Sequence, residues 1–528
     1  MVFYKKIILF ALFFSFSQIL LSAVNDSVES NSALKVKQEL IELEIAKFRD
    51  LITITDANYI DSISIAKSSD AAFNSYLKAL DIQSEYYSPE VYKQLKQQQS
   101  GAIAGIGAYF ISIRDTAIVS KVYPNSPADS AGLRFGDILM FANSQALFKK
   151  NETEINSLVN GEPNTIANLI IKRDGKLIEF QIRRAGYQLS SLAVSFIEKK
   201  YGYIKASGFN ANSNIDFKNK LTYFKKQGIN KIIVDLRGNG GGYLDQVSQI
   251  ATNFLKKGDT IIKTKTTNAA FKADRFAEED GEFQNFQITV LVDKETASAS
   301  EILAGVVQDY DLGEIIGEIT YGKGTVQNWW EFKDGSAFRI TVAEYLTPSG
   351  RPINKKANSS NFNMDELRLQ LGDKNLEEIK PILGILAAGG KVPIFKSAKG
   401  KSIIALGGIY PDIRVNRDTL TPLTTVLNDN RTIHEFIYDL VGAKLDSLKS
   451  AHKSFARFAN DFQITDQDLE TLKQYSLRRN IWNEQMYIID KEAIRTLIKA
   501  RIAEAIWGDD AYWYCQSQND NTYKKAVN

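Results

Sequence analysis

Cysteine and histidine are almost absent from this chain of 528 residues. The single cysteine, Cys515, excludes an internal disulfide and a cysteine-rich zinc site. The two histidines, His434 and His452, both stand late in the chain, so chemistry that relies on a histidine in the first 430 residues is excluded. Most histidine–metal sites are thereby removed, and a Ser-His-Asp triad is disfavoured unless a late histidine folds back.

An excess of charge of either sign is missing as well. The chain has 65 Lys and Arg residues against 62 Asp and Glu residues, and this net charge of +3 gives no general electrostatic reason to expect a nucleic-acid partner. Hydrophobic residues make up 44% and charged residues 24% of the chain. This balance is typical of a folded protein with a buried core and excludes a disordered chain.

A long apolar run is found only at the N-terminus. The basic start Lys5-Lys6 precedes an apolar run from Ile7 to Leu21, and the small residue Ala23 follows it. This layout predicts a signal peptide over residues 1–23, cleaved near Ala23, and export to the periplasm. An uncleaved membrane anchor stays the alternative, although the run is short and interrupted for a bilayer span.

The rest of the chain divides into four regions. Apolar spacings of three and four predict helices at both ends, short alternating runs predict a β domain, and strands alternating with helices predict a mixed sheet with packed helices. The expected boundaries are 24–99 for an N-terminal helical arm, 100–186 for the β domain, 187–418 for the α/β core with an excursion at 353–400, and 419–528 for a C-terminal helical domain.

The β domain has Gly105, Ile106 and Gly107 before its first long strand, and Ser126-Pro127-Ala128 and Gly136-Asp137-Ile138 in its centre. A Gly-Ile-Gly segment alone could be a plain turn. Together these segments resemble a PDZ domain, in which a Gly-rich loop binds a peptide carboxylate while the peptide pairs with a sheet edge. The resemblance implies that Gly105, Ile106 and Gly107 bind the C-terminal end of a protein.

A candidate nucleophile stands at a strand-to-helix turn. Thr296–Glu301 follows a strand that reads as buried and opens a helix, with Ser298 at the turn. Such a serine is often only a helix cap. In an open α/β sheet, however, this turn lies at the ligand-binding end of the strands, and a first-turn N–H group such as that of Ala299 can face a developing oxyanion.

A serine nucleophile needs a base, and Lys323 is the candidate. It stands between Gly322 and Gly324, which permit a tight turn. A free lysine has a pKa of about 10.4, but desolvation can lower it by several units. Thr325, Gln327 or a backbone carbonyl could hold the neutral amine by hydrogen bonds. The pattern favours a serine nucleophile activated by lysine.

A glycine-rich turn, Gly238–Gly242, follows the strand Lys231–Leu236. Its backbone can offer a second N–H group to the oxyanion. The turn matches neither G-x-x-x-x-G-K-[ST] nor G-x-G-x-x-G, so nucleotide binding is not expected.

Three motifs occur in order: TASASEI at Thr296–Ile302, QDY at Gln308–Tyr310, and TYGKGTVQ at Thr320–Gln327. With the PDZ block before them, they resemble the carboxyl-terminal-processing, or tail-specific, serine proteases over most of residues 60–415. The resemblance implies an α/β serine protease core that uses no cofactor and no metal. Glu295 departs from the pattern, because many relatives have glycine there.

The resemblance also implies a role for each matching residue. Ser298 would be the nucleophile, Lys323 its general base, and Gln327 the residue that orients the lysine. The backbone N–H groups expected to form the oxyanion hole are those of Ala299 and of Gly241 or Gly242.

Four other residues are interpreted as secondary. Asp309 falls 11 residues after Ser298, about 16 Å along a helix, which is too far for proton transfer and indicates a supporting role. Ser300 is a rival nucleophile that the motif spacing disfavours. Glu301 reads as a helix-start charge, and His434 as a helix-surface residue rather than a triad member.

The sequence therefore favours an exported serine endopeptidase with a Ser-Lys dyad. It would bind the C-terminal tails of unfolded or tagged protein substrates through its PDZ domain and cleave them through an acyl-enzyme. A non-catalytic peptide-binding scaffold and a hydrolase of small esters are the alternatives. A homo-oligomer, or a regulator bound through the C-terminal domain, stays open.

Overall fold

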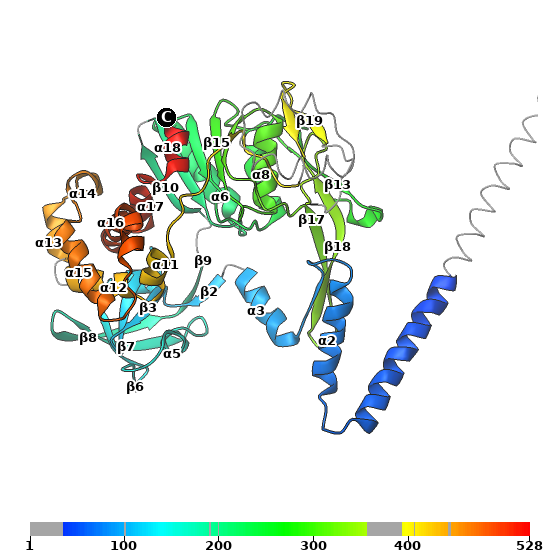
Figure 1. Cartoon of the computed structure of the whole chain (residues 1–528), viewed down its shortest axis with the longest axis horizontal. Coiled ribbons are helices and arrows are strands. Elements are labelled where there is room, and N and C mark those ends of the chain that lie inside the picture. The colour runs from blue at the N-terminus through cyan, green and yellow to red at the C-terminus, as the bar shows by residue number, and fades with distance from the viewer. Residues whose placement is uncertain are drawn as a thin grey trace, which may run out of the picture. The chain divides into compact units, whose positions relative to one another are not determined.

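The computed structural model describes residues 35–99, 102–188, 192–198, 200–355, 393–405, 407–441 and 445–528 (Figure 1). The predicted signal peptide lies outside the described residues. Within the described ranges, no helix combines the length and the apolar character needed to cross a bilayer. The chain divides into two compact units, which are described separately: Met1–Ser88 with Glu331–Arg339, and Pro89–Trp330 with Ile340–Asn528.

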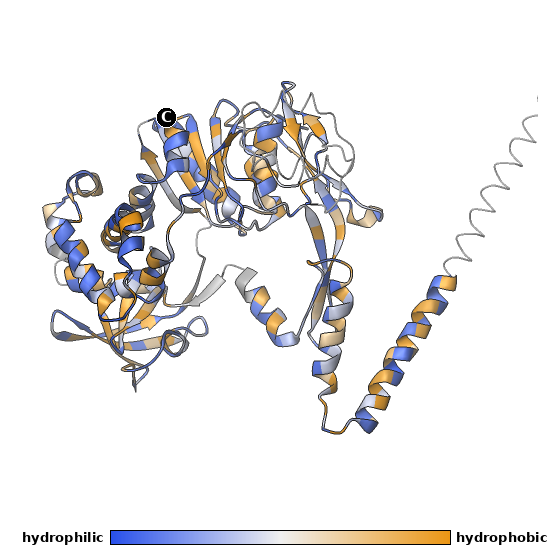
Figure 2. Cartoon of the chain, viewed as in Figure 1, coloured by the Kyte–Doolittle hydropathy of each residue, from blue (hydrophilic) through white to orange (hydrophobic). Residues whose placement is uncertain are grey.

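The smaller unit is mainly helical. Its described elements are a helix over 35–58, α2 (Ile65–Lys78), β1 (Glu85–Tyr87) and the hairpin tip Glu331–Arg339. β1 pairs antiparallel with the start of β18 (Ala337–Leu346), where Tyr86 lies opposite Phe338. Ser64 caps α2 by accepting a hydrogen bond from the Lys67 N–H. Apolar residues recur along both helices (Figure 2), as the spacing predicted.

The β domain belongs to the larger unit and forms an antiparallel sheet with short helices. Its elements, with the helix that precedes them, are α3 (Pro89–Gln99), β2 (Ala102–Gly105), β3 (Ala108–Ile113), β4 (Thr116–Val122), α4 (Pro127–Ala131), β5 (Ile138–Ala142), β6 (Gln145–Ala146), α5 (Glu152–Val159), β7 (Ile166–Arg173), β8 (Lys176–Arg183) and β9 (Ala185–Gln188). The strands pair in the order β3-β4-β5-β7-β8, with β6 on β5 and a separate β2–β9 pair. β3 is therefore an edge strand, and α5 contacts it.

Both helices of this sheet domain follow recognisable sequence signals. α4 starts after the cap residue Ser126 with a proline in its first turn, and it ends at Gly132 in the left-handed conformation, with φ of 83°. α5 starts with a capping box between Asn151 and Glu154, each side chain bonding the other's backbone N–H.

The α/β core is built around a six-stranded sheet (Figure 1). Its elements are β10 (Leu192–Glu198), β11 (Tyr201–Ala206), α6 (Ser213–Lys226), β12 (Lys231–Asp235), α7 (Leu244–Thr252), β15 (Gln287–Val292), α8 (Ala299–Asp309), β16 (Gly313–Gly317) and β21 (Ile413–Arg414). The order is β10-β11-β12-β15-β16-β21, and every pair except β10–β11 is parallel. The carboxyl ends of β11, β12 and β15 therefore lie side by side. The predicted mixed sheet with packed helices is confirmed.

A second set of strands lies outside the six-stranded sheet and includes β17, which starts within the lysine motif. The elements are β13 (Thr260–Lys265), a 3-10 turn (Ala269–Phe271), β14 (Arg275–Phe276), β17 (Thr325–Glu331), β19 (Ile394–Lys396) and β20 (Ser402–Ile404). β13 pairs with β14 and with the second half of β18, which also pairs with β17. β19 lies within the predicted excursion 353–400 and forms a hairpin with β20, which lies just after it. Residues 356–392 of the excursion lie outside the described part.

The helix that opens with the nucleophile motif is packed on all sides. All 11 residues of α8 are buried. Its Ile302 and Val306 share one apolar core with Val234 of β12, Val290 of β15 and Ile315 of β16. Burial of this many apolar side chains holds the helix start in one place.

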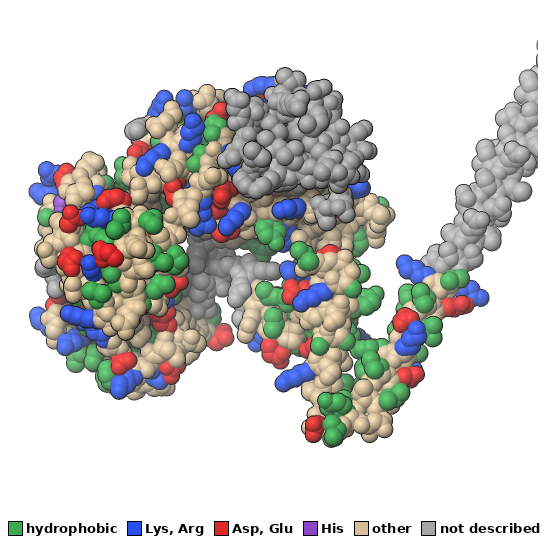
Figure 3. Space-filling model, viewed as in Figure 1, with side chains coloured by type: hydrophobic (Ala, Val, Ile, Leu, Met, Phe, Trp, Pro, Cys, Tyr) green, Lys and Arg blue, Asp and Glu red, His purple; other side chains and the backbone are tan. Residues whose placement is uncertain are grey.

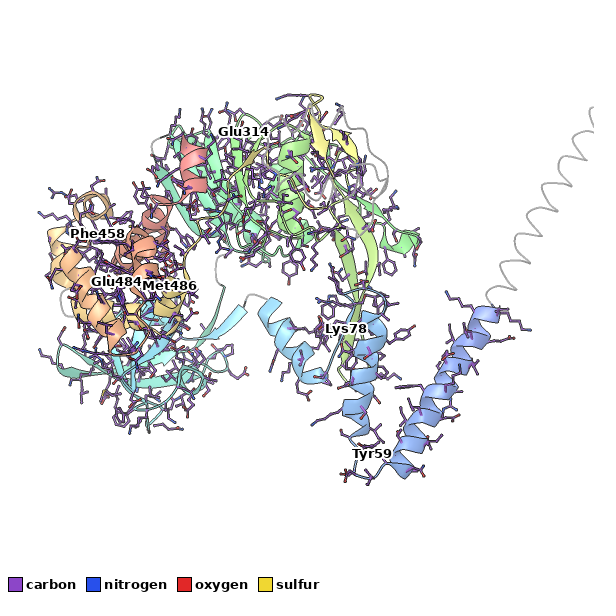
Figure 4. All side chains as sticks on the ribbon, in the orientation of Figure 1. Tyr59, Lys78, Glu314, Phe458, Glu484 and Met486 are labelled. Carbon is purple, nitrogen blue, oxygen red and sulfur yellow. The ribbon has the colours of Figure 1, made fainter. Side chains whose placement is uncertain are left out.

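The C-terminal region is helical, as predicted. Its helices are α11 (Pro422–Asp429), α12 (Thr432–Val441), α13 (Leu445–Ala451), α14 (Phe455–Asp461), α15 (Asp466–Leu477), α16 (Glu484–Trp507), α17 (Asp509–Ser517) and α18 (Asn521–Val527). All of them except α18 contribute to a core that includes Leu427, Phe436, Ile494 and Phe458, the last labelled in Figure 4. Tyr523 of α18 packs instead with Tyr203 of β11 and Ile233 of β12. Figure 3 shows acidic and basic side chains interspersed over the visible face of this region, as expected from a near-neutral net charge.

Candidate active site

Ser298 occupies a strained turn between β15 and α8. Its φ of 57° and ψ of −120° lie in a region that residues with a β-carbon rarely adopt. Such strain persists only where surrounding contacts hold the backbone, and it is typical of functional turns. The Ser298 N–H donates to the Glu301 carboxylate at 2.8 Å, and the Glu301 N–H donates to the Ser298 carbonyl at 2.9 Å. Ser298 itself is only partly buried, so the turn is accessible.

Glu301 joins the turn at Thr296–Glu301, called the nucleophile turn after its predicted role, to the turn at Thr320–Gly324, called the lysine turn. Its Oε2 accepts the Ser298 N–H at 2.8 Å and the Lys323 N–H at 2.9 Å. Its Oε1 accepts the Thr320 hydroxyl at 2.5 Å and the Gly322 N–H at 2.7 Å. Since both nitrogens bond to one oxygen, the backbone nitrogens of Ser298 and Lys323 lie no farther apart than the sum of those bond lengths, about 5.7 Å. The structure thus brings together two residues that are 25 positions apart in the chain.

The helix-start interpretation of Glu301 is incomplete. The side chain does stand in the first turn of α8, but it is fully buried. Burial raises the pKa of this carboxyl group, while the hydrogen bonds from Thr320, Gly322, Lys323 and Ser298 act in the opposite direction. A residue that holds two functional turns through four donors is a positioning residue. The S-x-x-E spacing of a capping box was the one sequence signal that pointed to it.

Replacing Glu301 with glutamine tests this role. The amide NH2 cannot accept the hydrogen bonds that one carboxylate oxygen accepts, so two donors lose their partner. We expect a lower melting temperature, since each buried unpaired donor costs about 1–3 kcal/mol. We also expect a loss in kcat/KM of about a hundredfold through misplacement of the reacting groups. The matched control is Glu314→Gln, an exposed residue of β16 (Figure 4), which should change neither quantity.

The lysine turn is held by backbone contacts on several sides. The Tyr321 N–H donates to the Thr296 carbonyl at 2.9 Å, and the Tyr345 N–H donates to the Gly324 carbonyl at 2.7 Å. A β-carbon on Gly324 would lie 2.3 Å from the backbone nitrogen of Asn354, so only glycine fits at this position. The turn is therefore rigid on both sides of Lys323.

Gln327 lies on β17, four residues after the lysine. Its Nε2 donates to the Thr325 hydroxyl at 2.7 Å, and it lies 3.4 Å from the Thr341 hydroxyl on β18. These contacts fix the amide on the strand that leaves the lysine turn. The predicted role of Gln327 in orienting Lys323 stays a prediction.

The glycine-rich turn lies directly against the nucleophile turn. A β-carbon on Gly241 would lie 2.9 Å from the Ser298 Cβ and 3.0 Å from the Ala299 nitrogen. The φ of Gly241 is 106°, so its backbone conformation also requires glycine. The Ala297 N–H donates to the Asn239 carbonyl at 3.0 Å, which ties the two turns together.

The candidate oxyanion donors differ in availability. Ala299 is the first residue of α8, where the backbone N–H has no partner within the helix. The Gly241 N–H already donates to the Asn239 side chain at 2.8 Å. Gly242 lies opposite Phe209 in an isolated parallel β-bridge. The two hydrogen bonds of this bridge run from the Phe209 N–H to the Gly241 carbonyl and from the Tyr243 N–H to the Phe209 carbonyl, so the Gly242 N–H is not part of it. Of the two glycines, Gly242 is therefore the better candidate.

Asp293 is a further connection that the sequence did not reveal. This buried carboxylate follows β15 and accepts hydrogen bonds from the N–H groups of Gly238 at 3.0 Å, Glu295 at 3.0 Å and Thr296 at 3.0 Å. It thus links the glycine-rich turn to the nucleophile turn. Glu295 lies at the protein surface, where its carboxylate pairs with Arg417 at 3.3 Å.

A buried charge cluster supports the other end of the glycine-rich turn. Asp235 ends β12 and bonds to the Tyr203 hydroxyl at 2.7 Å and to Arg237 at 2.6 Å. Burial alone would raise the pKa of Asp235, but the charges of Arg237 and Lys205 outweigh it and hold the pKa below the usual range. Arg237 also pairs with Asp520, just before α18, at 2.7 Å. The cap residue of the last helix thereby contacts Arg237, which directly precedes the glycine-rich turn.

Two of the residues interpreted as secondary, Ser300 and Asp309, are buried. Ser300 is fully buried, and its hydroxyl makes no hydrogen bond with any described residue. Asp309 is also buried and bonds to Arg351 at 2.9 Å and to the Ser349 N–H at 2.9 Å. These contacts tie the end of α8 to the segment after β18, a supporting arrangement.

The loop Gly105–Gly107, which the sequence predicts to bind a carboxylate, stands directly before an edge strand. Gly107 has a φ of 79°, and a β-carbon there would lie 2.2 Å from the Ser126 Cβ. Ile106 is buried, and its carbonyl accepts the Ala128 N–H at 2.7 Å. Gly105 ends β2, and the edge strand β3 begins directly after Gly107. A tightly packed glycine loop thus leads into an edge strand, and carboxylate binding by it stays a prediction.

His434 is not the surface residue that the sequence suggested. It lies on α12 with its Nδ1 buried and without a hydrogen-bond partner among the described residues. Burial lowers its pKa to about 4, and the charges of Arg501 and Arg431 add to this effect. Its place in the C-terminal helices gives no support to a triad.

We expect this histidine to make the protein sensitive to acid. The unfolded chain binds a proton at His434 near pH 6.5, whereas the folded chain does so only near pH 4. Folding stability should therefore be complete above pH 6.5 and fall by up to roughly 3 kcal/mol as the pH drops to 4. The His434→Gln variant should lose this part of the pH dependence of the melting temperature. An unchanged profile in the variant would contradict the assignment.

Family models match three parts of the chain. Residues 200–363 match peptidase family S41, residues 104–183 match the PDZ domain, and residues 423–508 match a family of unknown function (DUF8443). These ranges fall within the predicted core, β domain and C-terminal region.

Individual proteins show the same similarity. A protein named "Probable CtpA-like serine protease" from Staphylococcus aureus (strain bovine RF122 / ET3-1) is 31% identical over 376 residues, which cover 66% of this chain and 73% of the relative. Its namesake from Staphylococcus epidermidis is 32% identical over 311 residues, covering 57% of this chain and 61% of the relative. Among solved structures, the photosystem II D1 C-terminal processing protease has 24% identity and a TM-score of 0.33, covering 58% of this chain and 89% of that one. The predicted resemblance is confirmed: the chain belongs to peptidase family S41, as a serine protease of the carboxyl-terminal-processing type that carries a PDZ domain.

Proposed function

We propose that the protein is an endopeptidase with a Ser298–Lys323 dyad that recognises the C-terminal tails of its substrates. The observation that carries the proposal is the shared Glu301 oxygen, which accepts the backbone N–H of both residues. The packing of Gly241 against Ser298 supports it, because this contact brings backbone donors to the same point.

The reaction follows from these positions. The neutral amine of Lys323 takes the proton of the Ser298 hydroxyl, and the oxygen attacks the scissile carbonyl carbon. The N–H groups of Ala299 and Gly242 stabilise the resulting oxyanion. Collapse breaks the peptide bond, the lysine proton passes to the leaving amine, and an acyl-enzyme remains. Water, deprotonated by the same lysine, then attacks the acyl carbonyl, the bond from the Ser298 oxygen to that carbon breaks, and the lysine returns the proton to the serine oxygen as the new carboxyl end leaves.

Apart from water, the reaction as proposed uses only groups of the chain. Proton transfer and oxyanion stabilisation are both assigned to side chains and backbone groups of the protein, so no cofactor enters the proposal. Gln327 would keep the lysine amine directed at the serine through a hydrogen bond.

The PDZ domain would select substrates by their free C-terminus. A tail that pairs with the edge of β3 gains backbone hydrogen bonds whatever its sequence, and its carboxylate meets the N–H groups of Gly105, Ile106 and Gly107. Unfolded or tagged proteins expose such tails. We further propose that cleavage occurs in the periplasm after removal of residues 1–23, as the basic and apolar start of the sequence indicates.

The test compares two forms of one unstructured protein with an apolar C-terminus, one with a free carboxylate and one amidated. The free form should be cleaved with a kcat/KM at least about tenfold higher, mainly through a lower KM, because a charged hydrogen-bonding partner is lost in the amidated form. Equal cleavage of both forms would refute tail recognition. Binding of the free form without any cleavage would instead support the non-catalytic scaffold.

A further inference from the structure

The proposed site for a substrate tail is formed by two elements of the PDZ domain. β3 is the edge strand, and α5 lies in contact with it. A residue of the C-terminal helical domain contacts each of them. We propose that this helical domain completes the tail-binding site of the PDZ domain, with Arg431 as a positioning residue that holds α5 beside β3. The proposal rests on the proposed tail recognition and extends it to a region whose family has no known function.

The first contact joins the helical domain to α5. Arg431, immediately before α12, bonds to the Glu152 carboxylate through Nη2 at 3.0 Å and through Nε at 3.2 Å. Glu152 is the first residue of α5. The same carboxylate lies 3.4 Å from the hydroxyl of Tyr109, which stands on β3. One carboxylate thus connects the helical domain, α5 and the edge strand, and two-point arginine–carboxylate bonds have a defined geometry.

The second contact joins the helical domain to the end of β3. Arg114 follows this strand and forms hydrogen bonds with both Glu435 and Asp439 of α12. Between these two acids, Tyr438 packs against an apolar cluster of three isoleucines on β3 and β4: Ile111, Ile113 and Ile118. Because ionic and apolar contacts occur on one helix face, α12 is docked along the strand rather than touching it at a point.

The backbone of Arg431 indicates that its position is enforced. Its φ is 59°, a conformation that arginine rarely adopts. The Arg431 carbonyl accepts the Glu435 N–H at 2.9 Å, so the residue takes part in the first turn of α12 while its side chain reaches α5. Strain of this kind persists where several contacts determine a residue's position at once.

The same domain also contacts the protease core. Lys121 of β4 pairs with Asp509 of α17 at 2.6 Å, and the adjacent Asp510 accepts the Ser195 N–H of β10 at 3.2 Å. The helical domain therefore contacts both the PDZ sheet and the first strand of the core sheet. A tail site held in this way is pre-organised, which favours binding because less freedom is lost when the peptide docks.

The experiment measures tail binding in the full-length Ser298→Ala protein with a fluorescent peptide that has a free apolar C-terminus. Arg431→Ala should raise the Kd about fivefold. The charge exchange Arg431→Glu with Glu152→Arg should return the Kd to within about twofold of the parent. Arg457→Ala, an exposed arginine of the same domain, is the matched control and should leave the Kd unchanged.

Kinetics in the active protein separate positioning from general damage. Arg431→Ala should raise the KM of the free-tail substrate by the same factor, with kcat altered by less than about twofold. The proposal is overturned if the peptide Kd does not respond to Arg431→Ala, or if kcat falls equally for free and amidated substrates. If the parent protein itself does not bind the peptide, the proposed tail recognition fails instead, which is a distinguishable result.

Discussion

The Ser298→Ala protein is expected to lose peptide-bond cleavage by at least a thousandfold while it keeps its fold. Removal of a nucleophile abolishes the acyl-enzyme route, and only the weak contribution of the oxyanion donors remains. The backbone bond from residue 298 to Glu301 does not involve the hydroxyl, so the turn should persist. The measurement is kcat/KM on the free-tail protein substrate, with the melting temperature as a check on folding.

Ser300→Ala is the matched control for this result. Ser300 lies two residues away, is fully buried, and makes no hydrogen bond with the described residues. Replacing an unpaired buried hydroxyl by a methyl group should leave stability unchanged or slightly higher. An inactive Ser300→Ala protein beside an active Ser298→Ala protein would show that the nucleophile has been misassigned.

The second large effect is expected from Lys323→Met, with a loss in kcat/KM of about 10²–10⁴. Methionine keeps much of the length of the side chain and the backbone bond to Glu301 but has no group that can accept a proton. In the parent protein, the acylation rate should rise with pH to a plateau, because only the neutral amine can act as the base. The variant should lack this rise.

Single-turnover rates from pH 6 to 10 provide the measurement for Lys323. Lys355→Met is the control, because this lysine lies in the same region, where its backbone N–H bonds to the Gly322 carbonyl at 3.0 Å and its side chain is exposed. It should keep the parent rate and the parent pH profile. Full activity of Lys323→Met would rule out the dyad and would require another base.

The regular elements of the core were predictable because their signals are local. The segment QITVLV was expected as a buried strand and forms β15 with the same limits, Gln287–Val292. The helix expected from Ser298 to Tyr310 runs from Ala299 to Asp309. Apolar periodicity and turn residues are properties of neighbouring positions, so the limits of these two elements were predictable to within one residue.

Contacts between distant positions were not predictable in the same way. Glu301 looked like an ordinary helix-start acid because its partners Thr320 and Lys323 lie about twenty residues away in the chain. Asp293 had no role in the sequence analysis, although it ties Gly238 to the nucleophile turn. His434 looked exposed, because neither its burial nor the two nearby arginines can be recognised from spacing.

The amino-acid sequence by itself determined the order of the domains, the approximate limits of the core strands and helices, and the segments that form the turns around Ser298, Lys323 and the glycines. These properties depend on residue type and short-range spacing. Only the tertiary structure decided that one buried carboxylate joins the serine and lysine turns and that Gly241 lies against Ser298. It also decided that the C-terminal helical domain contacts both α5 and β3 of the PDZ domain. Each of these contacts exists because parallel strands bring their carboxyl ends together, or because separate domains pack, and neither effect is encoded in neighbouring residues.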